Sequence, residues 1–104
     1  MKFSIVYSTT SNMKEAGKIA NVLLKERIAA CVNIFPIESK YRWNGKLCNE
    51  KEIGMIIKTA QNRAGSVIKR IKSMNSYEIP CIISLSIDNG NKEFLNWIAG
   101  EVKK

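Results

Sequence analysis

Apolar side chains recur at every second position in two short stretches, one near each end of the chain. This period is typical of a β-strand with one covered face. The first stretch predicts a strand of about seven residues, and the second predicts a strand that ends at Asp88, before an Asn89-Gly90 turn. The alternating apolar residues are Phe3, Ile5 and Tyr7 in the first strand, and Ile83, Leu85 and Ile87 in the second.

Between these strands, the stretch from Arg27 to Lys58 predicts one oversized β-hairpin. Its tip is Asn44-Gly45, because a two-residue type I′ turn needs positive φ at both central positions, and Asn and Gly tolerate it. Before the tip, Tyr41 and Trp43 alternate with charged residues, so the aromatic groups share one face. The segment from Ile28 to Ile37 is mostly apolar, as in a strand covered on both faces.

The arm from Ala30 to Trp43 is too long for a compact domain. At about 3.3 Å per residue it would reach on the order of 45 Å, whereas a chain of this size is roughly 35 Å across. We expect Pro36 to break the arm with a bulge or a bend, because proline has no N–H. The outer hairpin has no helix to cover it, so we expect copies of the chain to associate there. The alternative is a monomer with a loop from Pro36 to Ser39 and a small exposed hairpin.

Three helices are predicted where apolar residues recur at every third or fourth position. The first runs from Met13 to about Arg27 and is capped by Ser11 or Asn12. The second stops at Asn75-Ser76, and the third is capped by Asn91. The apolar positions are Ala16, Gly17, Ala20, Leu23 and Leu24 in the first helix, Ala64, Val67, Ile68, Ile71 and Met74 in the second, and Phe94, Leu95, Ile98 and Val102, expected to be buried, in the third.

The predicted order of elements is β, α, β, β, α, β, α within one domain that spans residues 1–104. A helix between two strands normally joins parallel neighbours by a right-handed crossover. Two such units that share a sheet through the central hairpin give an α+β, ferredoxin-like βαββαβ sandwich with an extra C-terminal helix. The helices cover one face of the sheet. The other face carries many apolar side chains, which is a second reason to expect association.

Composition indicates an ordinary globular protein of a reducing compartment. Hydrophobic residues make up 45% of the chain and charged residues 25%, which argues against disorder. No apolar run approaches the ~20 residues needed to span a bilayer, and no signal peptide is evident, so we expect a cytoplasmic protein without membrane contact. Three cysteines and no histidine argue against a disulfide scaffold and a structural zinc site. Cys48, just after the turn, is the thiol we expect to be most exposed.

The net charge of +8 permits attraction to phosphates or other anions without specifying such a partner. Five cations and no acid lie between Glu52 and Glu78. On a helical projection, the charges of the second helix scatter opposite its apolar side chains, as on an ordinary solvated surface. No aromatic stacking motif accompanies them, so we expect a solvated face rather than nucleic-acid binding. A module that binds anions or nucleic acid is the alternative function.

The chain is poorly equipped for catalysis, and we expect no enzymatic activity. It lacks histidine, the usual general base at neutral pH, and no serine, cysteine or lysine has an evident activating partner. Its glycines are isolated, so no phosphate-binding loop is expected. Glu50 and Glu52 share one face of a strand, where a solvated strand end explains them best. Tyr77 and Glu78, beside Pro80, either line a cleft or anchor a loop.

Several segments in combination resemble the CutA family of divalent-cation tolerance proteins. They are Ile28–Asn33, the pattern Tyr41-x-Trp43-x-Gly45-Lys46, Glu52–Thr59, Tyr77–Pro80 and Trp97. The resemblance runs from the first strand to the last helix with matching spacing. It implies a ferredoxin-like fold related to the PII signalling proteins, assembled as a homotrimer through intersubunit β-sheet. It also implies a link to tolerance of copper and other divalent metals.

The resemblance gives expected sites for contacts between subunits and for binding. On the hairpin, the expected contacts between subunits are Phe35, Tyr41, Trp43 and Leu47. A cleft between subunits is the expected surface for a small molecule or a protein partner, and its residues are Trp43, Lys58, Tyr77 and Glu78. We therefore expect a non-enzymatic trimer that acts in the response to metal ions by binding a ligand, a metal or a partner protein.

The chain departs from the family at the positions that bind copper in some bacterial members. The resemblance places those ligands, one cysteine and two consecutive histidines, at Ser8, Met74 and Asn75. Serine and asparagine oxygens are weak substitutes for thiolate and imidazole. Met74 offers a thioether to copper(I), although its helical spacing favours a core position. We expect weak or no specific binding of copper or another divalent cation at these positions.

Overall fold

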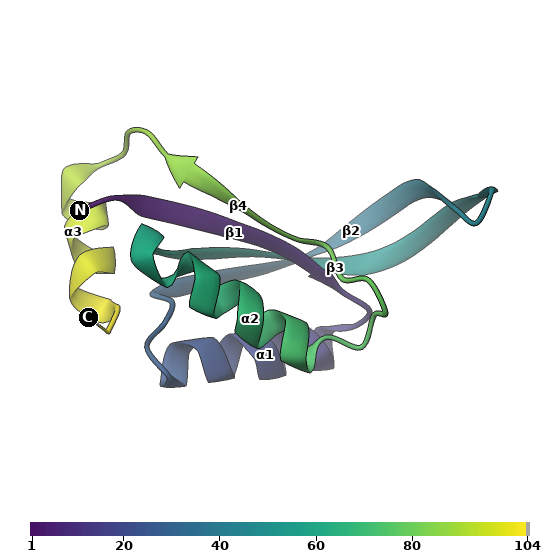
Figure 1. The fold of residues 1–104 in the computed structure, drawn as a ribbon, viewed down its shortest axis with the longest axis horizontal. Coiled ribbons are helices and arrows are strands. Elements are labelled where there is room, and N and C mark those ends of the chain that lie inside the picture. Colours follow the sequence, from purple (N-terminus) through teal and green to yellow (C-terminus); the bar gives the residue numbers. More distant parts are fainter. Residues whose placement is uncertain (104) are drawn as a thin grey trace.

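A four-stranded antiparallel sheet forms the centre of the computed structural model, which describes residues 1–103 (Figure 1). The strands are β1 (Phe3–Thr10), β2 (Cys31–Trp43), β3 (Lys46–Ala60) and β4 (Ile82–Ile87), in the spatial order β2-β3-β1-β4. The helices are α1 (Met13–Lys25), α2 (Ala64–Met74), which follows a 3₁₀ turn at Gln61–Arg63, and α3 (Lys92–Glu101). No helix among these residues is long and apolar enough to cross a membrane.

This order of strands confirms the predicted ferredoxin-like fold, with one difference in detail. β1 and β2 run parallel but are not neighbours, because β3 lies between them and pairs antiparallel with both. α1 and α2 cover the same face of the sheet (Figure 1). The main core fills the space between this face and the two helices, and its fully buried residues include Val6, Ile19, Leu23, Met55, Ile57, Val67 and Ile71.

Local sequence rules account for the ends of most elements. Asn44 and Gly45 have φ values of 50° and 77°, as the type I′ turn requires. Asn12 caps α1 by accepting a hydrogen bond of 2.8 Å from the N–H of Glu15. Asn91 caps α3 in the same way. The predicted turn and the predicted caps are therefore confirmed.

The hairpin of β2 and β3 extends far beyond the rest of the domain, and the chain, hairpin included, is 44 Å in its longest dimension (Figure 1). The prediction that Pro36 breaks β2 is wrong, because one register pairs the strands from Cys31 to Trp43 without a bulge. Trp43 and Lys46, beside the turn, form a hydrogen-bonded pair, and such pairs alternate with non-hydrogen-bonded pairs along the two strands. Pro36 therefore falls in a non-hydrogen-bonded pair, and its backbone nitrogen points away from β3. β2 is an edge strand, where no hydrogen bond from that nitrogen is needed.

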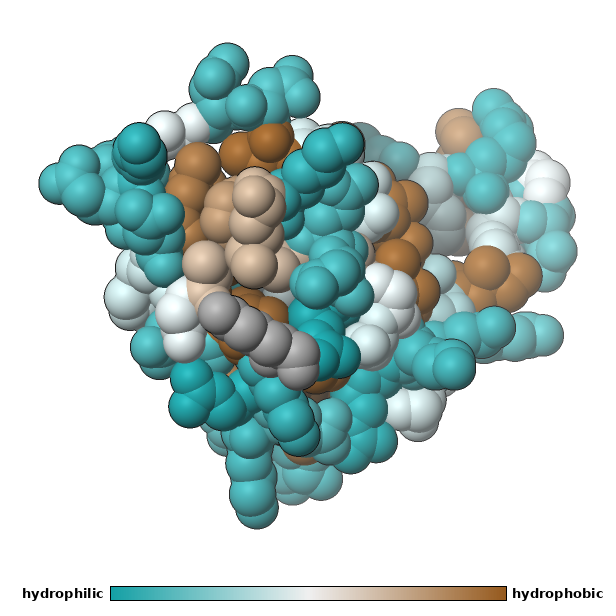
Figure 2. Space-filling model, turned by 60° about the vertical axis from the view of Figure 1, so that its left-hand side comes forward, coloured by the Kyte–Doolittle hydropathy of each residue, from teal (hydrophilic) through white to brown (hydrophobic). Residues whose placement is uncertain are grey.

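The face of the sheet opposite α1 and α2 is only partly covered. α3 packs across one end of the molecule, where Ile98 and Val102 join Phe3 in a second, smaller core. Hydrophobic side chains remain on the surface around this end, between hydrophilic ones (Figure 2). Along β4, Ile83 and Leu85 are 52% and 54% exposed. We call this surface of β1, β3 and β4 the open face.

Candidate functional site

The three positions that the resemblance assigned to copper ligands lie where β1, β4 and the end of α2 meet. Ser8 is fully buried, and its Oγ donates a hydrogen bond of 2.7 Å to the carbonyl oxygen of Cys81. Asn75 follows α2, and its side-chain amide donates a hydrogen bond of 3.0 Å to the carbonyl oxygen of Thr9. Met74 is half-buried and packs against the main core, in the position that its helical spacing favours.

These contacts determine how well the three positions suit a metal ion. The Ser8 hydroxyl and the Asn75 amide already hold the backbone of the chain together. Hydroxyl and amide oxygens are also weak ligands for copper. In the part of the chain that the structure describes, no group of three or more His, Cys, Asp or Glu side chains is arranged to hold a metal ion. The residues present do not fit the copper site that the resemblance implies.

Tyr77 is held against the hairpin by its hydroxyl group. The Tyr77 hydroxyl donates a hydrogen bond of 2.8 Å to Oε1 of Glu52 on β3, and the Tyr77 N–H donates to Oδ1 of Asn75. Burial raises the pKa of Tyr77 well above its usual value of 10.0, and the bond to Glu52 raises it further. The sequence left two interpretations for Tyr77, which either lines a cleft or anchors a loop. Within one chain, Tyr77 anchors a loop. Glu78, the next residue, is exposed.

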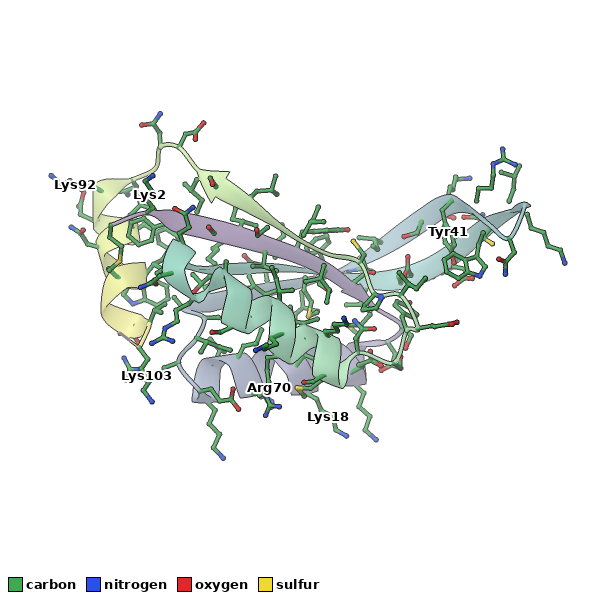
Figure 3. All side chains as sticks on the ribbon, viewed as in Figure 1. Lys2, Lys18, Tyr41, Arg70, Lys92 and Lys103 are labelled. Carbon is green, nitrogen blue, oxygen red and sulfur yellow. The ribbon has the colours of Figure 1, made fainter. Side chains whose placement is uncertain are left out.

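A second phenol lies beside a second carboxylate on the projecting part of the hairpin. The neighbouring Glu50 carboxylate, together with partial desolvation, raises the pKa of Tyr41 to about 12. Glu50 and Glu52 are two residues apart on one strand and share a face. We call Tyr41, Glu50, Glu52 and Tyr77 the phenol–carboxylate cluster. Figure 3 labels Tyr41 on the part of the hairpin that extends beyond the sheet.

The cluster contains hydrogen-bonding groups but no activated nucleophile. Two thiols lie near the cluster: Cys48, which pairs with Tyr41 across the hairpin, and Cys81. Cys81 is exposed whereas Cys48 is half-buried, so the expectation that Cys48 is the most exposed thiol is wrong. Burial and the charge of Glu52 raise the pKa of Cys81, which disfavours the reactive thiolate. The arrangement can donate and accept hydrogen bonds but is not set up for nucleophilic attack.

Lys58 and two aromatic side chains form a second group, at the α3 end of the open face. The Lys58 ammonium lies 5.5 Å from the ring centroid of Phe94, a cation–π arrangement. The rings of Phe94 and Trp97 stack with centroids 5.6 Å apart and an interplanar angle of 26°. Phe94 is 40% exposed, so the prediction that α3 buries it is wrong. Helical spacing correctly placed Phe94 on the side of α3 that faces the sheet. It could not show that α3 covers only a small part of the sheet.

One chain does not bring the predicted cleft residues together. Trp43 pairs with Lys46 beside the turn, whereas Lys58 lies at the other end of β3. Lys58 is twelve positions after Lys46 along β3, which at about 3.3 Å per position is roughly 40 Å. Tyr77 lies between these ends, beside Glu52. The four predicted cleft residues therefore occupy three separate places within one chain.

The expected contacts between subunits lie in two environments. Tyr41, Trp43 and Leu47, near the turn, are 39%, 44% and 78% exposed. Phe35 lies further back, where its ring covers Gly54 so closely that a Cβ atom there would be 2.9 Å from Phe35 Cε2. Near the turn, three large apolar side chains are thus exposed without a helix beneath them.

Sequence reasoning missed the bond from Tyr77 to Glu52 and the stack of Phe94 on Trp97. Tyr77 and Glu52 are 25 residues apart in the chain, and no local pattern connects them. The sequence showed Glu50 and Glu52 two positions apart on one predicted strand, and two carboxylates on one face of a strand indicate a candidate site. Their aromatic partners could be identified only from the fold.

Comparison with known proteins assigns the chain to a family. A family model described as CutA1 divalent ion tolerance protein matches residues 4–101. The divalent-cation tolerance protein CutA of Archaeoglobus fulgidus is 44% identical over 91% of this chain and 93% of its own length. The corresponding protein of Pyrococcus horikoshii is 38% identical over 96% of this chain and 98% of its own length.

Solved structures agree with this assignment. The structure of the A. fulgidus protein, named there as a periplasmic divalent cation tolerance protein, matches with a TM-score of 0.94 at 42% identity and covers 97% of this chain and 99% of that chain. The crystal structure of P. horikoshii CutA1 matches with a TM-score of 0.92 at 38% identity and covers the same shares of the two chains. Sequence and fold together place this chain in the CutA1 family of divalent ion tolerance proteins.

Proposed function

We propose that the chain forms a homotrimer that acts in the response to divalent metal ions, without enzymatic activity. It does so by binding a small ligand, a metal ion or a partner protein. The observation that carries this proposal is the projecting hairpin, because Tyr41, Trp43 and Leu47 are exposed on it and no helix covers it. Relatives named for divalent-cation tolerance support the link to metal ions.

The sheet offers two further reasons for association. β2 and β4 are its edges, and each leaves one row of backbone groups unpaired within the described chain. The open face exposes Ile83 and Leu85 next to the edge of β4. A neighbouring hairpin that packs on this face would cover apolar side chains and pair a free edge in the same contact. The similarity of the family to the PII proteins leads us to propose three copies.

Assembly would also complete the predicted cleft. Trp43 is roughly 40 Å from Lys58 along one hairpin, so these two residues can meet only between different copies. We therefore propose the binding surface where Trp43 of one copy approaches Lys58, Tyr77 and Glu78 of another. Hydrogen-bonding groups from the phenol–carboxylate cluster and the cation of Lys58 would then line one cleft.

Replacing Leu47 with aspartate tests the assembly. Leu47 is 78% exposed in the chain, so Leu47→Asp is expected to leave the fold intact while placing an unpaired charge in the contact between copies. Size-exclusion chromatography with light scattering should give three chain masses for the unchanged protein at micromolar concentration and one for the variant.

Met13→Asp is the matched control, because Met13 is 57% exposed on α1, away from the hairpin. It should keep three chain masses. A single chain mass for the unchanged protein, or a Leu47→Asp variant that stays trimeric, would contradict the proposal.

Binding of copper(II) at Ser8, Met74 and Asn75 is expected to be weak or absent, because their polar groups hold the backbone and are poor copper ligands. Calorimetric titration of copper(II) into the purified trimer should show no tight, stoichiometric binding. Double substitution with the family's residues, Ser8→Cys with Asn75→His, should increase copper affinity. Tight binding by the unchanged protein would show that other groups supply the ligands.

We propose a cytoplasmic location for the chain, based on its composition and its free cysteines. Its relatives are named for different compartments. The A. fulgidus protein is called periplasmic and the Arabidopsis thaliana protein chloroplastic.

A further inference from the structure

Most of the positive charge of the chain lies on the helical layer. Residues 13–27 and 61–75, which comprise α1, α2 and their ends, contain eight lysines and arginines and two glutamates. Their net charge is therefore +6, out of +8 for the whole chain. The sheet, the hairpin and α3 together carry almost balanced charge. The proposed assembly uses the hairpin and the open face, so the helical layer stays available in a trimer as in a single chain.

Both acids of this layer already have partners. Oε2 of Glu26 is 2.9 Å from Nη2 of Arg70, the one ion pair among the described residues. Oε1 of Glu15 accepts a hydrogen bond from the N–H of Ser76. Within residues 1–103, the remaining cations of α1 and α2 have no carboxylate within ion-pair distance.

Five lysines of the helical layer make up what we call the lysine face. All five are exposed, and they are Lys14, Lys18 and Lys25 on α1 and Lys69 and Lys72 on α2. At 100° per residue the three lysines of α1 lie within about 40° of one another, opposite the buried Ile19 and Leu23. Figure 3 shows Lys18 on the outer side of α1, pointing away from the sheet, with Arg70 on the neighbouring helix.

Helix stability explains only Lys25 and Lys72, which lie in the last turns of α1 and α2, where the helix dipole favours a cation. Lys14 is in the first turn of α1, where the helix dipole disfavours a cation. Lys14 and Lys18 are four residues apart, a spacing at which like charges destabilise a helix by a few tenths of a kcal/mol. The pair Lys69 and Lys72 repeats this at a spacing of three. An anionic partner that contacts the whole face would relieve this repulsion.

We propose that the lysine face binds the phosphate backbone of double-stranded nucleic acid, without base specificity. The row from Lys14 to Lys25 extends over about 16 Å of helix axis, and a duplex presents one phosphate charge per ~1.7 Å. The segments 13–27 and 61–75 contain no aromatic residue that could stack on an unpaired base. This absence led us to expect a solvated face from the sequence, but it argues only against a single-stranded partner, because contacts to the phosphates of a duplex need no stacking.

A lipid surface fits this face less well. A helix that binds in a membrane interface needs a broad apolar face to insert beside its cations. The apolar side chains of α1 and α2 are used in the core, and the exposed large ones in this layer are Met13 and Leu24 alone among the described residues.

Fluorescence anisotropy of a labelled 20-base-pair DNA duplex of mixed sequence, titrated with the full chain between 50 and 200 mM salt, tests the proposal. Each lysine–phosphate contact contributes about −0.9 to the slope of log K against log salt, so five contacts predict a slope of about −4 to −5. Lys14→Gln, Lys18→Gln and Lys25→Gln together should weaken binding at least about tenfold at low salt and make the slope shallower by about 2.7.

Lys51→Gln, Lys92→Gln and Lys103→Gln together are the matched control. They remove the same charge from exposed positions outside the lysine face and should leave the slope within about one unit of the original. No binding to the duplex at 50 mM salt would overturn the proposal. So would equal losses in the two triple variants, or binding to vesicles of anionic phospholipid without binding to the duplex. Light scattering on the same samples measures the number of chains in the assembly independently of DNA binding. A negative result for DNA binding therefore does not contradict the proposed trimer.

Discussion

Replacing Leu23 with alanine is expected to lower the free energy of unfolding by about 2–5 kcal/mol. Leu23 is fully buried on the inner side of α1, within the main core. Alanine there removes apolar contacts and leaves a cavity that the rigid sheet can fill only in part. Urea unfolding followed by circular dichroism, at one fixed protein concentration for both proteins, measures the change.

The next residue supplies the control. Leu24 has the same side chain on the same helix but is 40% exposed. Leu24→Ala should therefore cost less than about 1 kcal/mol, because little apolar surface is lost from a buried environment and alanine favours the helix. Equal losses for the two variants would mean that α1 does not pack with the inward face described here.

Replacing Tyr77 with phenylalanine is expected to lower the free energy of unfolding by about 1–2 kcal/mol at pH 7, because the hydrogen bond from the phenol to the Glu52 carboxylate is lost. The raised pKa of Tyr77 also predicts how this loss depends on pH. Folding favours the protonated phenol, so the contribution of Tyr77 is complete below its ordinary pKa of 10.0 and declines as pH rises above that value. The gap in stability between the two proteins should narrow from pH 10 upwards.

Urea unfolding of both proteins at pH 8 and at pH 11 measures this gap. Tyr41→Phe is the control, since Tyr41 lies on the exposed hairpin and its hydroxyl should contribute much less to stability. A gap between wild type and Tyr77→Phe that stays constant from pH 8 to pH 11 would show that the phenol does not titrate as described.

Local chemistry made the elements of this fold predictable. The turn at Asn44-Gly45 can be predicted without knowledge of the rest of the chain, because a turn with positive φ at two successive residues favours asparagine and glycine. The same holds for the caps at Asn12 and Asn91, each of which bonds an N–H within three residues. The order of elements then left few ways to build the sheet, and the ferredoxin-like arrangement followed.

Predictions that depended on neighbours distant in sequence were less successful. Pro36 was expected to break β2, but a proline is harmless on an edge strand, and the strand order that makes β2 an edge is a property of the whole sheet. Phe94 was expected inside because its spacing along α3 is correct. α3, however, crosses only the end of the sheet and leaves part of the ring exposed.

The candidate site shows the same difference between what local sequence predicts and what depends on residues distant in the chain. Resemblance to a family selected Tyr77 and Lys58, and the structure gives each a specific contact, with Glu52 and with Phe94. The sequence showed that Ser8 and Asn75 are not the cysteine and histidine that the resemblance leads one to expect at these positions. The hydrogen bonds that these two side chains now make to the backbone of Cys81 and Thr9 could not, because they join β1 to segments more than 60 residues away.

The two free edges of the sheet, β2 and β4, are different surfaces of one molecule. When one such edge docks on the other edge of the next copy, the contact repeats, and its rotation angle decides between a closed ring and an endless fibre. In the trimer that we propose, the long hairpin contacts the neighbouring copy, sets that angle and stops growth. Shortening the hairpin would therefore endanger solubility before it endangered folding, since the unguided edges would polymerise.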